Sequence, residues 1–285
     1  MADTLEDDYV ADGTHAFSDN DESELEFDGA EQQDDQSQEQ QAGPSATKKR
    51  KRQLEKQRKA KKRKLAEDTA SGGVPHSSVA AQAPTILQKY IASSQAKAFD
   101  GATVIELQDL AIPEESIEDT SAFANERSLH NLKEFIETAT PTLRTRLGQK
   151  SKREGAPTLI VITLAAMRGA DVVRALRDLR TEKSGQVAKL FAKHFKVNEH
   201  VQYLRKTKIV AAVGTPGRLG KLLEADDCLS LDALSHIIID FTYQDSKKRT
   251  IFDIPETRQE LFKTVFANDR LKRALQSGKV KLVLF

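Results

Sequence analysis

The 285 residues allow one large domain or two small ones, and the near-neutral net charge of +1 conceals a strong segregation of charge along the chain. The sequence has no run of about 18 apolar residues, and its N-terminus is acidic where a secretory signal is basic and then apolar. We therefore expect a soluble intracellular protein without a membrane partner. Cys228 is the single cysteine, which excludes an internal disulfide and suits a reducing compartment.

The first 82 residues are predicted to lack a core. Residues 1–47 contain 15 Asp and Glu but no Lys or Arg, so we expect a disordered acidic head. Residues 48–70 form a basic run whose two clusters are typical of nuclear import signals and of nucleic-acid-binding patches. The residues predicted to bind RNA there are Lys48, Lys49, Arg50, Lys51, Arg52, Lys61, Lys62, Arg63 and Lys64. Residues 71–82 are small and polar and are predicted to be a linker.

Residues 83–285 carry the signals of one folded domain. Helical spacing of apolar residues predicts helices near 86–91 and over 128–139. Short, mostly β-branched runs predict strands, and the amphipathic segments between them predict covering helices. The expected strands are 158–163, 208–214, 236–240 and 279–285, and the expected helices are 170–180, 200–206, 217–224 and 256–277 with a break near Asn268. This alternation indicates an α/β fold in three layers, with a parallel sheet between helices.

The segment from Val213 to Asp240 reads as strand, tight turn, helix and strand. Thr215 is placed to cap the helix that Pro216 opens, and a free helix N-terminus offers N–H groups to an anion. Gly217 permits close approach of a backbone, and Arg218 adds a bidentate phosphate donor. The alternative is that these four residues only end a strand and begin a helix.

These residues resemble the first domain of DEAD-box RNA helicases. The string TPGR from Thr215 to Arg218 resembles the motif with which that family contacts the RNA backbone, and LSLDALSHIIID resembles the lead-in to its DEAD box. TLIVITLAAMRGADVVRALRDL occupies the place of the PTRELA turn, and KVKLVLF resembles the strand before the Ser-Ala-Thr motif. The resemblance implies a single RecA-like, P-loop-NTPase-like domain over residues 83–285, with Thr215, Gly217 and Arg218 on the RNA.

The departures from that family predict a protein that is not an enzyme. The chain contains no G-x-x-x-x-G-K-[ST] string to hold nucleotide phosphates, and the nearest fragment is Gly148-Gln149-Lys150-Ser151. Asp240-Phe241-Thr242-Tyr243 stands in place of Asp-Glu-Ala-Asp, which leaves Asp240 as either a lone cation ligand or a carboxylate at a strand end. A second RecA-like domain is also not expected. We predict no catalytic residues, no cofactor and no small-molecule substrate.

An acidic-then-basic head joined to a reduced helicase half is similar to the Cms-one ribosomal small-subunit family of nucleolar proteins. Three further features are similar to that family: the segment LAAMRGADVVRAL, the segment VAKLFAKHFKVNEHVQYLRKTKIVAAVGTPGRL, and the Phe after Asp240. The resemblance implies association with the earliest small-subunit pre-ribosomal particle and a location in the nucleus and nucleolus. The implied partners are pre-ribosomal RNA and proteins of that particle. The six histidines show no metal spacing beside the lone cysteine, so no metal site is expected.

The sequence thus predicts a non-catalytic assembly factor in small-subunit ribosome biogenesis and pre-rRNA processing. Two alternatives stay open. One is a pure protein-interaction scaffold that makes no RNA contact through the TPGR turn. The other is a weak NTPase whose phosphate site is built from other backbone amides.

Overall fold

The computed structural model describes residues 79–181, 183–192, 195–225 and 228–285. The predicted acidic head, the basic run and most of the predicted linker lie outside these residues. Val79 and Ala80 are buried in the main hydrophobic core, so packed structure is present before the predicted start at residue 83.

A five-stranded parallel sheet forms the centre of the fold and confirms the predicted α/β class. Its strands are β1 (Leu159–Ile162), β2 (Gln186–Leu190), β3 (Ile209–Gly214), β4 (His236–Ile239) and β5 (Lys281–Leu284), in the order β2-β3-β1-β4-β5. Four strands coincide with apolar runs of the sequence. The sequence reasoning missed β2, because this edge strand alternates exposed or half-buried Gln186, Val187 and Lys189 with buried residues.

Helices connect the strands and flank the sheet. They are α3 (Pro84–Ala98), α4 (Val104–Asp109), η1 (Glu114–Ser116), η2 (Leu129–Asn131), α5 (Leu132–Ala139), α6 (Pro141–Leu147), α7 (Ala166–Arg177), α8 (Val197–Lys206), α9 (Pro216–Glu224), α10 (Pro255–Gln259), the π-helix η3 (Glu260–Phe266) and α11 (Asp269–Gln276). Several begin with proline at the first helical position, where the missing N–H costs no hydrogen bond. The Asn268 side chain accepts from the N–H groups of Arg270 and Leu271, which confirms the predicted break near Asn268.

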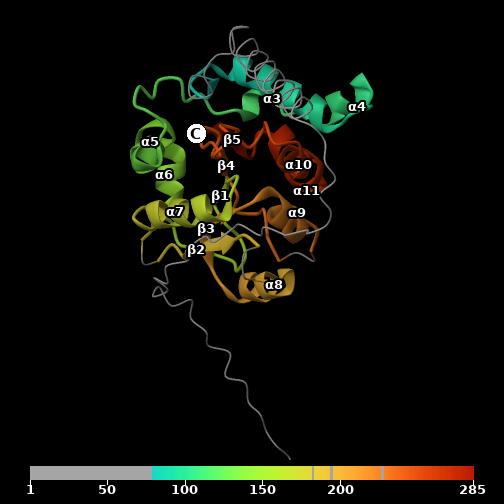
Figure 1. Ribbon diagram of the computed structural model, residues 1–285. Helices are drawn as coiled ribbons and strands as arrows, with labels where there is room; N and C mark the ends of the chain where they lie inside the picture. The colour runs from blue at the N-terminus through green and yellow to red at the C-terminus, as the bar shows by residue number, and fades with distance from the viewer. Residues whose placement is uncertain (1–78, 182, 193–194, 226–227) are drawn as a thin grey trace, which may run out of the picture. The chain divides into compact units, whose positions relative to one another are not determined.

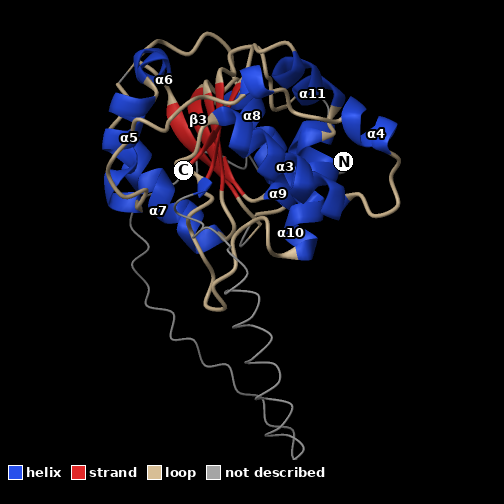
Figure 2. Ribbon diagram, turned by 90° about the horizontal axis from the view of Figure 1, so that it is seen from above, coloured by secondary structure: helices blue, strands red, loops and turns tan. Residues whose placement is uncertain are grey.

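The helices lie on both faces of the sheet (Figures 1 and 2). Helices α5, α6 and α7 pack on one face against Leu159 and Val161, whereas α3, α8, α9, η3 and α11 pack on the other against Ile160 and Ile162. Because both faces are covered, successive residues of β1 are all buried. This explains why the strand reads as a continuous apolar run.

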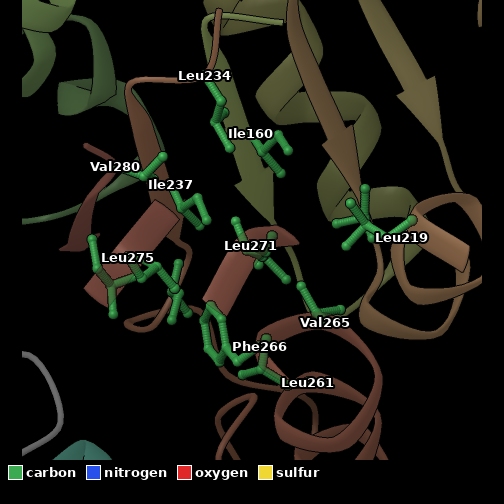
Figure 3. Close-up of a cluster of buried hydrophobic side chains, with 14 of the residues drawn as sticks. Ile160, Leu219, Leu234, Ile237, Leu261, Val265, Phe266, Leu271, Leu275 and Val280 are labelled. Carbon is green, nitrogen blue, oxygen red and sulfur yellow. The ribbon is translucent and has the colours of Figure 1, made fainter. Parts of the chain in front are cut away.

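The larger of the two cores lies between the sheet and the C-terminal helices. Figure 3 shows Leu219 of α9, Val265 of η3 and Leu271 of α11 in one cluster with Ile160 and Ile237 of the sheet. All five side chains are at most 2% exposed. Burial of this kind stabilises the fold by about 1.5 to 3 kcal/mol for each large aliphatic side chain. None of the helices in the described part of the chain combines the length and apolarity that crossing a bilayer requires.

The outer edge of β5 is covered by the segment between η1 and α5. Ile117 forms a parallel bridge with Leu282, and the Glu118 N–H donates to the Leu282 carbonyl at 2.9 Å. The buried Arg127 guanidinium donates to the Leu284 carbonyl at 3.1 Å and to the Thr120 carbonyl at 2.7 Å. These bonds use edge groups that an uncovered strand would present to another chain. Burial lowers the pKa of Arg127 to about 10.

Candidate nucleic-acid interface at the carboxyl edge of the sheet

The residues singled out in the sequence meet at the carboxyl edge of the sheet. The register pairs Ile162 with Gly214 and with Ile239, so the turns that follow β1, β3 and β4 lie side by side. The Thr163 N–H donates to the Gly214 carbonyl at 2.9 Å and the Asp240 N–H to the Ile162 carbonyl at 3.0 Å. Ligands of open parallel α/β sheets bind at this edge, so it is the first place to look for a site.

Thr215 occupies the N-cap position of α9, as predicted, and Pro216 is its first helical residue. The Thr215 backbone is extended, and its carbonyl accepts from the N–H groups of Arg218 at 3.1 Å and Leu219 at 3.0 Å. The Thr215 hydroxyl, however, makes no capping hydrogen bond. The half-buried hydroxyl therefore has hydrogen-bonding capacity that the helix start does not use.

Gly217 lets two helices approach each other closely. A Cβ at position 217 would lie 2.6 Å from Oε1 of Glu260, and a Cβ at position 220 would collide with the Thr264 side chain. Both partners belong to η3, so these glycines form the contact surface between α9 and η3. The Glu260 carboxylate consequently lies against the first turn of α9, where a negative charge is favoured by the helix dipole and competes with a phosphate for the same place.

The structure turns Arg218 toward α8. Its Nη2 donates to the Phe195 carbonyl at 2.7 Å, its Nη1 lies 3.3 Å from Nδ1 of His200, and the residue is only 8% exposed. Burial lowers the pKa of His200 to about 4, with a further contribution from Arg218, so the imidazole is neutral at pH 7. Its Nδ1 can then accept from Arg218. In this arrangement Arg218 holds the turn against α8.

Asp240 forms a buried ion pair with Arg168, a residue that the sequence did not single out. Nε of Arg168 donates to Oδ2 of Asp240 at 2.7 Å and its Nη2 donates to Oδ1 at 3.0 Å. The Asp240 side chain is 1% exposed, and the Arg168 guanidinium also lies over the Tyr243 ring, 5.0 Å from its centroid. Both carboxylate oxygens thus serve a bidentate ion pair. A cation could bind Asp240 only by displacing Arg168.

Burial raises the pKa of Asp240, and the hydrogen bonds from Arg168 oppose this shift. The sequence gives only a weak indication that Arg168 and Asp240 form a pair. Arg168 follows β1 by less than two helical turns, and Asp240 directly follows β4, which neighbours β1. Nothing local in the sequence says that the two side chains meet.

The fragment from Gly148 to Ser151 lies elsewhere. It follows α6 and precedes β1, so it is at the opposite, amino edge of the sheet and lacks the strand-before, helix-after context of a phosphate-binding loop. Within the described residues, no group of three or more His, Cys, Asp and Glu is placed to hold a metal ion. The nine predicted RNA-binding residues between Lys48 and Lys64 lie outside the described residues.

Comparison with known proteins gives a consistent set of matches. The family model CMS1, described as a U3-containing 90S pre-ribosomal complex subunit, matches residues 30–285. Protein CMS1 of Chaetomium thermophilum is 40% identical over 181 residues, which are 64% of this chain and 71% of that protein. Protein cms1 of Schizosaccharomyces pombe is 29% identical over 66% of both chains, and Protein CMSS1 of Homo sapiens is 32% identical over 56% of this chain and 54% of its own.

Proposed function

This chain belongs to the CMS1 family, and from that membership we propose that it acts as a non-catalytic assembly factor of the small-subunit pre-ribosomal particle. The proposed role includes pre-rRNA processing, with pre-ribosomal RNA and proteins of the particle as partners and the nucleolus as location. The family description, a subunit of a U3-containing 90S pre-ribosomal complex, supports this assignment.

The observation that carries the non-catalytic part of the proposal is the closed ion pair at Asp240. Phosphoryl transfer depends on groups positioned around a nucleotide and its metal ion. Here both oxygens of the Asp240 carboxylate, at the end of β4, accept hydrogen bonds from Arg168, and the side chain is 1% exposed. The sequence also contains no phosphate-binding loop string. Saturable binding of ATP in calorimetry, together with ATP consumption in the presence of RNA, would favour the weak-NTPase alternative.

We place the RNA contact of the folded domain at the turn formed by Thr215, Gly217 and Arg218, supplemented by the basic run from Lys48 to Lys64. The unused Thr215 hydroxyl and the start of α9 support this placement. Arg218 contributes mainly by holding the turn, because its guanidinium is engaged with Phe195 and His200. An Arg218→Ala variant would therefore lose about 1 to 3 kcal/mol of stability along with any RNA contact, which makes it a poor test on its own.

A sharper test uses two substitutions that change RNA binding in opposite directions. Thr215→Val removes the hydroxyl and keeps the side-chain shape, so crosslinking of the full chain to RNA should fall. Glu260→Gln removes the negative charge beside Gly217, so crosslinking should rise. Thr257→Val, on the half-buried face of α10, serves as the matched control and should leave crosslinking unchanged.

If Thr215→Val and Glu260→Gln both crosslink like the parent and still sediment with the pre-ribosomal particle, the turn is not an RNA contact. The scaffold alternative then explains the domain. The inward orientation of Arg218 is the observation that favours this alternative, because it withdraws the predicted phosphate donor from the surface.

A further inference from the structure

The opposite edge of the sheet, where all five strands begin, is rich in exposed cations. In a parallel sheet the segments that lead into the strands gather on one side, and here they are residues 149–154, 178–185, 205–208, 228–235 and 277–280, of which residue 182 is not described. The exposed Lys and Arg of these segments, which we call the amino-edge face, are Lys150, Lys152, Arg153, Arg180, Lys183, Arg205, Lys206, Lys208 and Lys279.

Hydrogen bonds tie these segments into one continuous surface. The Gly155 N–H donates to the Thr207 carbonyl at 3.0 Å, which joins the segment before β1 to the segment before β3. The Thr181 hydroxyl donates to the Gly148 carbonyl at 3.3 Å, so the segment before β2 also joins. Across the five strands the face is about 19 Å wide, given a spacing of about 4.8 Å between neighbours.

The two remaining segments, before β4 and before β5, also join the face. Nη1 of Arg153 lies 2.7 Å from Oδ2 of Asp232. The Ser230 N–H donates to the Gly155 carbonyl at 2.8 Å, and the Lys281 N–H donates to the Ser235 carbonyl at 2.8 Å. The segment before β4 therefore borders the one before β1, and the start of β5 borders the segment before β4.

Among the described residues of these segments, basic side chains outnumber acidic ones. The described acids in these segments are Glu154, Asp178 and Asp232, against the nine cations. Glu154 is 3.9 Å from Nζ of Lys208, and both side chains are close to half exposed, so this pair contributes little in water. A net excess of positive charge remains and attracts a polyanion over a Debye length.

The character of the face favours nucleic acid over an acidic protein. Protein interfaces depend on apolar and aromatic anchors, whereas binding to a phosphate backbone depends on cations and the release of counterions. The exposed large hydrophobic side chains of the described residues are Ile86, Val104, Ile105 and Met167, and none belongs to the amino-edge face. The cations are mostly lysines, which act as point charges and read no base sequence.

We propose that the amino-edge face is a second RNA-binding surface, which contacts the phosphate backbone without sequence preference. It lies one strand length, about 20 Å, from the Thr215 turn, because β3 runs from one edge to the other. One domain can therefore contact two separate RNA segments. The inference rests on the proposed function only for the identity of the polyanion, which is RNA in a pre-ribosomal particle.

The test measures the salt dependence of binding to a mixed-sequence single-stranded RNA, using the full chain. The edge variant is Lys150→Gln/Lys206→Gln/Lys279→Gln, whose three lysines precede three different strands. The control variant carries the same change at the exposed Lys89, Lys97 and Lys133, which lie on α3 and α5 and give the same net charge. Since each single-strand phosphate contact contributes about 0.7 to the log-log salt slope, the edge variant should lose about 2 from that slope.

The control variant should keep the slope of the parent. Equal slopes for parent and edge variant, or equal losses in edge and control variants, would overturn the proposal. So would an edge variant that loses binding to poly-glutamate but keeps its RNA slope, because the face would then bind acidic protein. Sedimentation with the pre-ribosomal particle distinguishes this proposal from the proposed function. If the edge variant keeps the salt slope of the parent and the protein still sediments with the particle, the amino-edge face is refuted and the proposed function stands.

Discussion

Removing the arginine that faces Asp240 is the most direct test of how this fold is held at its carboxyl edge. Arg168→Met keeps the length of the side chain and leaves the carboxylate buried without a counter-charge. Breaking a buried ion pair on one side costs about 3 to 5 kcal/mol. Because Arg168 is 12% exposed and water can partly replace it, we expect the lower figure, about 3 kcal/mol. For a domain of this size that is a loss of about 6 to 12 °C in Tm.

The pH dependence of this loss has a definite sign. Burial raises the pKa of Asp240, and the opposing effect of Arg168 disappears in the variant. A carboxyl group whose folded-state pKa exceeds its unfolded value stabilises the fold at low pH and loses that contribution as pH rises through the folded pKa. The stability deficit of Arg168→Met relative to the parent should therefore be small in acid and grow toward neutral pH.

Urea unfolding followed by circular dichroism, at acidic and at neutral pH, measures this deficit. Arg174→Met is the matched control, because Arg174 lies on the same helix, is 72% exposed and pairs with Asp171 at the surface, so its loss should cost less than about 1 kcal/mol. Adding Asp240→Asn to Arg168→Met should restore part of the stability. A deficit that is absent, or equal at both pH values, would refute the interpretation of a closed ion pair.

Three further predictions concern packing and protonation. Gly220→Ala should lower the free energy of unfolding by about 1 to 3 kcal/mol, because its methyl group collides with Thr264, and an unchanged urea midpoint would contradict the close packing of α9 on η3. Burial lowers the pKa of His200 and of His236 to about 4. The free energy of unfolding should therefore rise by on the order of 1 to 2 kcal/mol for each histidine as pH rises from about 4 to about 6.5. Replacing either histidine by glutamine should flatten that rise. Arg127→Lys loses the planar fork that bonds Thr120 and Leu284, so amide exchange in β5 should accelerate, and unchanged protection would count against this edge contact.

The elements that the sequence located are those whose local pattern is strong. Apolar runs predicted four strands, and Asn268 marked the break between η3 and α11. The short helices α4 and α6 and the edge strand β2 escaped, since a few residues with mixed polarity give no periodic signal. Helix α7 begins at Ala166, earlier than the predicted 170. A Cβ at position 169 would lie 3.3 Å from the Phe191 ring, so the glycine in the first turn leaves room for that ring.

The candidate site likewise has parts that local sequence predicts and parts that it does not. The strand, turn and helix around Thr215 follow from local chemistry, since proline suits a first helical position and glycine a close approach. The orientation of Arg218 does not follow, because the Phe195 carbonyl and the neutral imidazole of His200 on α8 decide it. Membership of the family was accessible from motifs, whereas the amino-edge face is assembled from segments that are far apart in the chain.

By itself the sequence determined the α/β class, the positions of four strands and the absence of a phosphate-binding loop string, because each depends on residues close together in the chain. Only the tertiary structure decided that Arg168 pairs with Asp240, 72 residues away in the chain. It also decided that Glu260 lies against Gly217 and that nine cations lie at one edge of the sheet. The physical reason is that charge pairing and burial act through space, and parallel connections bring distant segments to a common edge of the sheet.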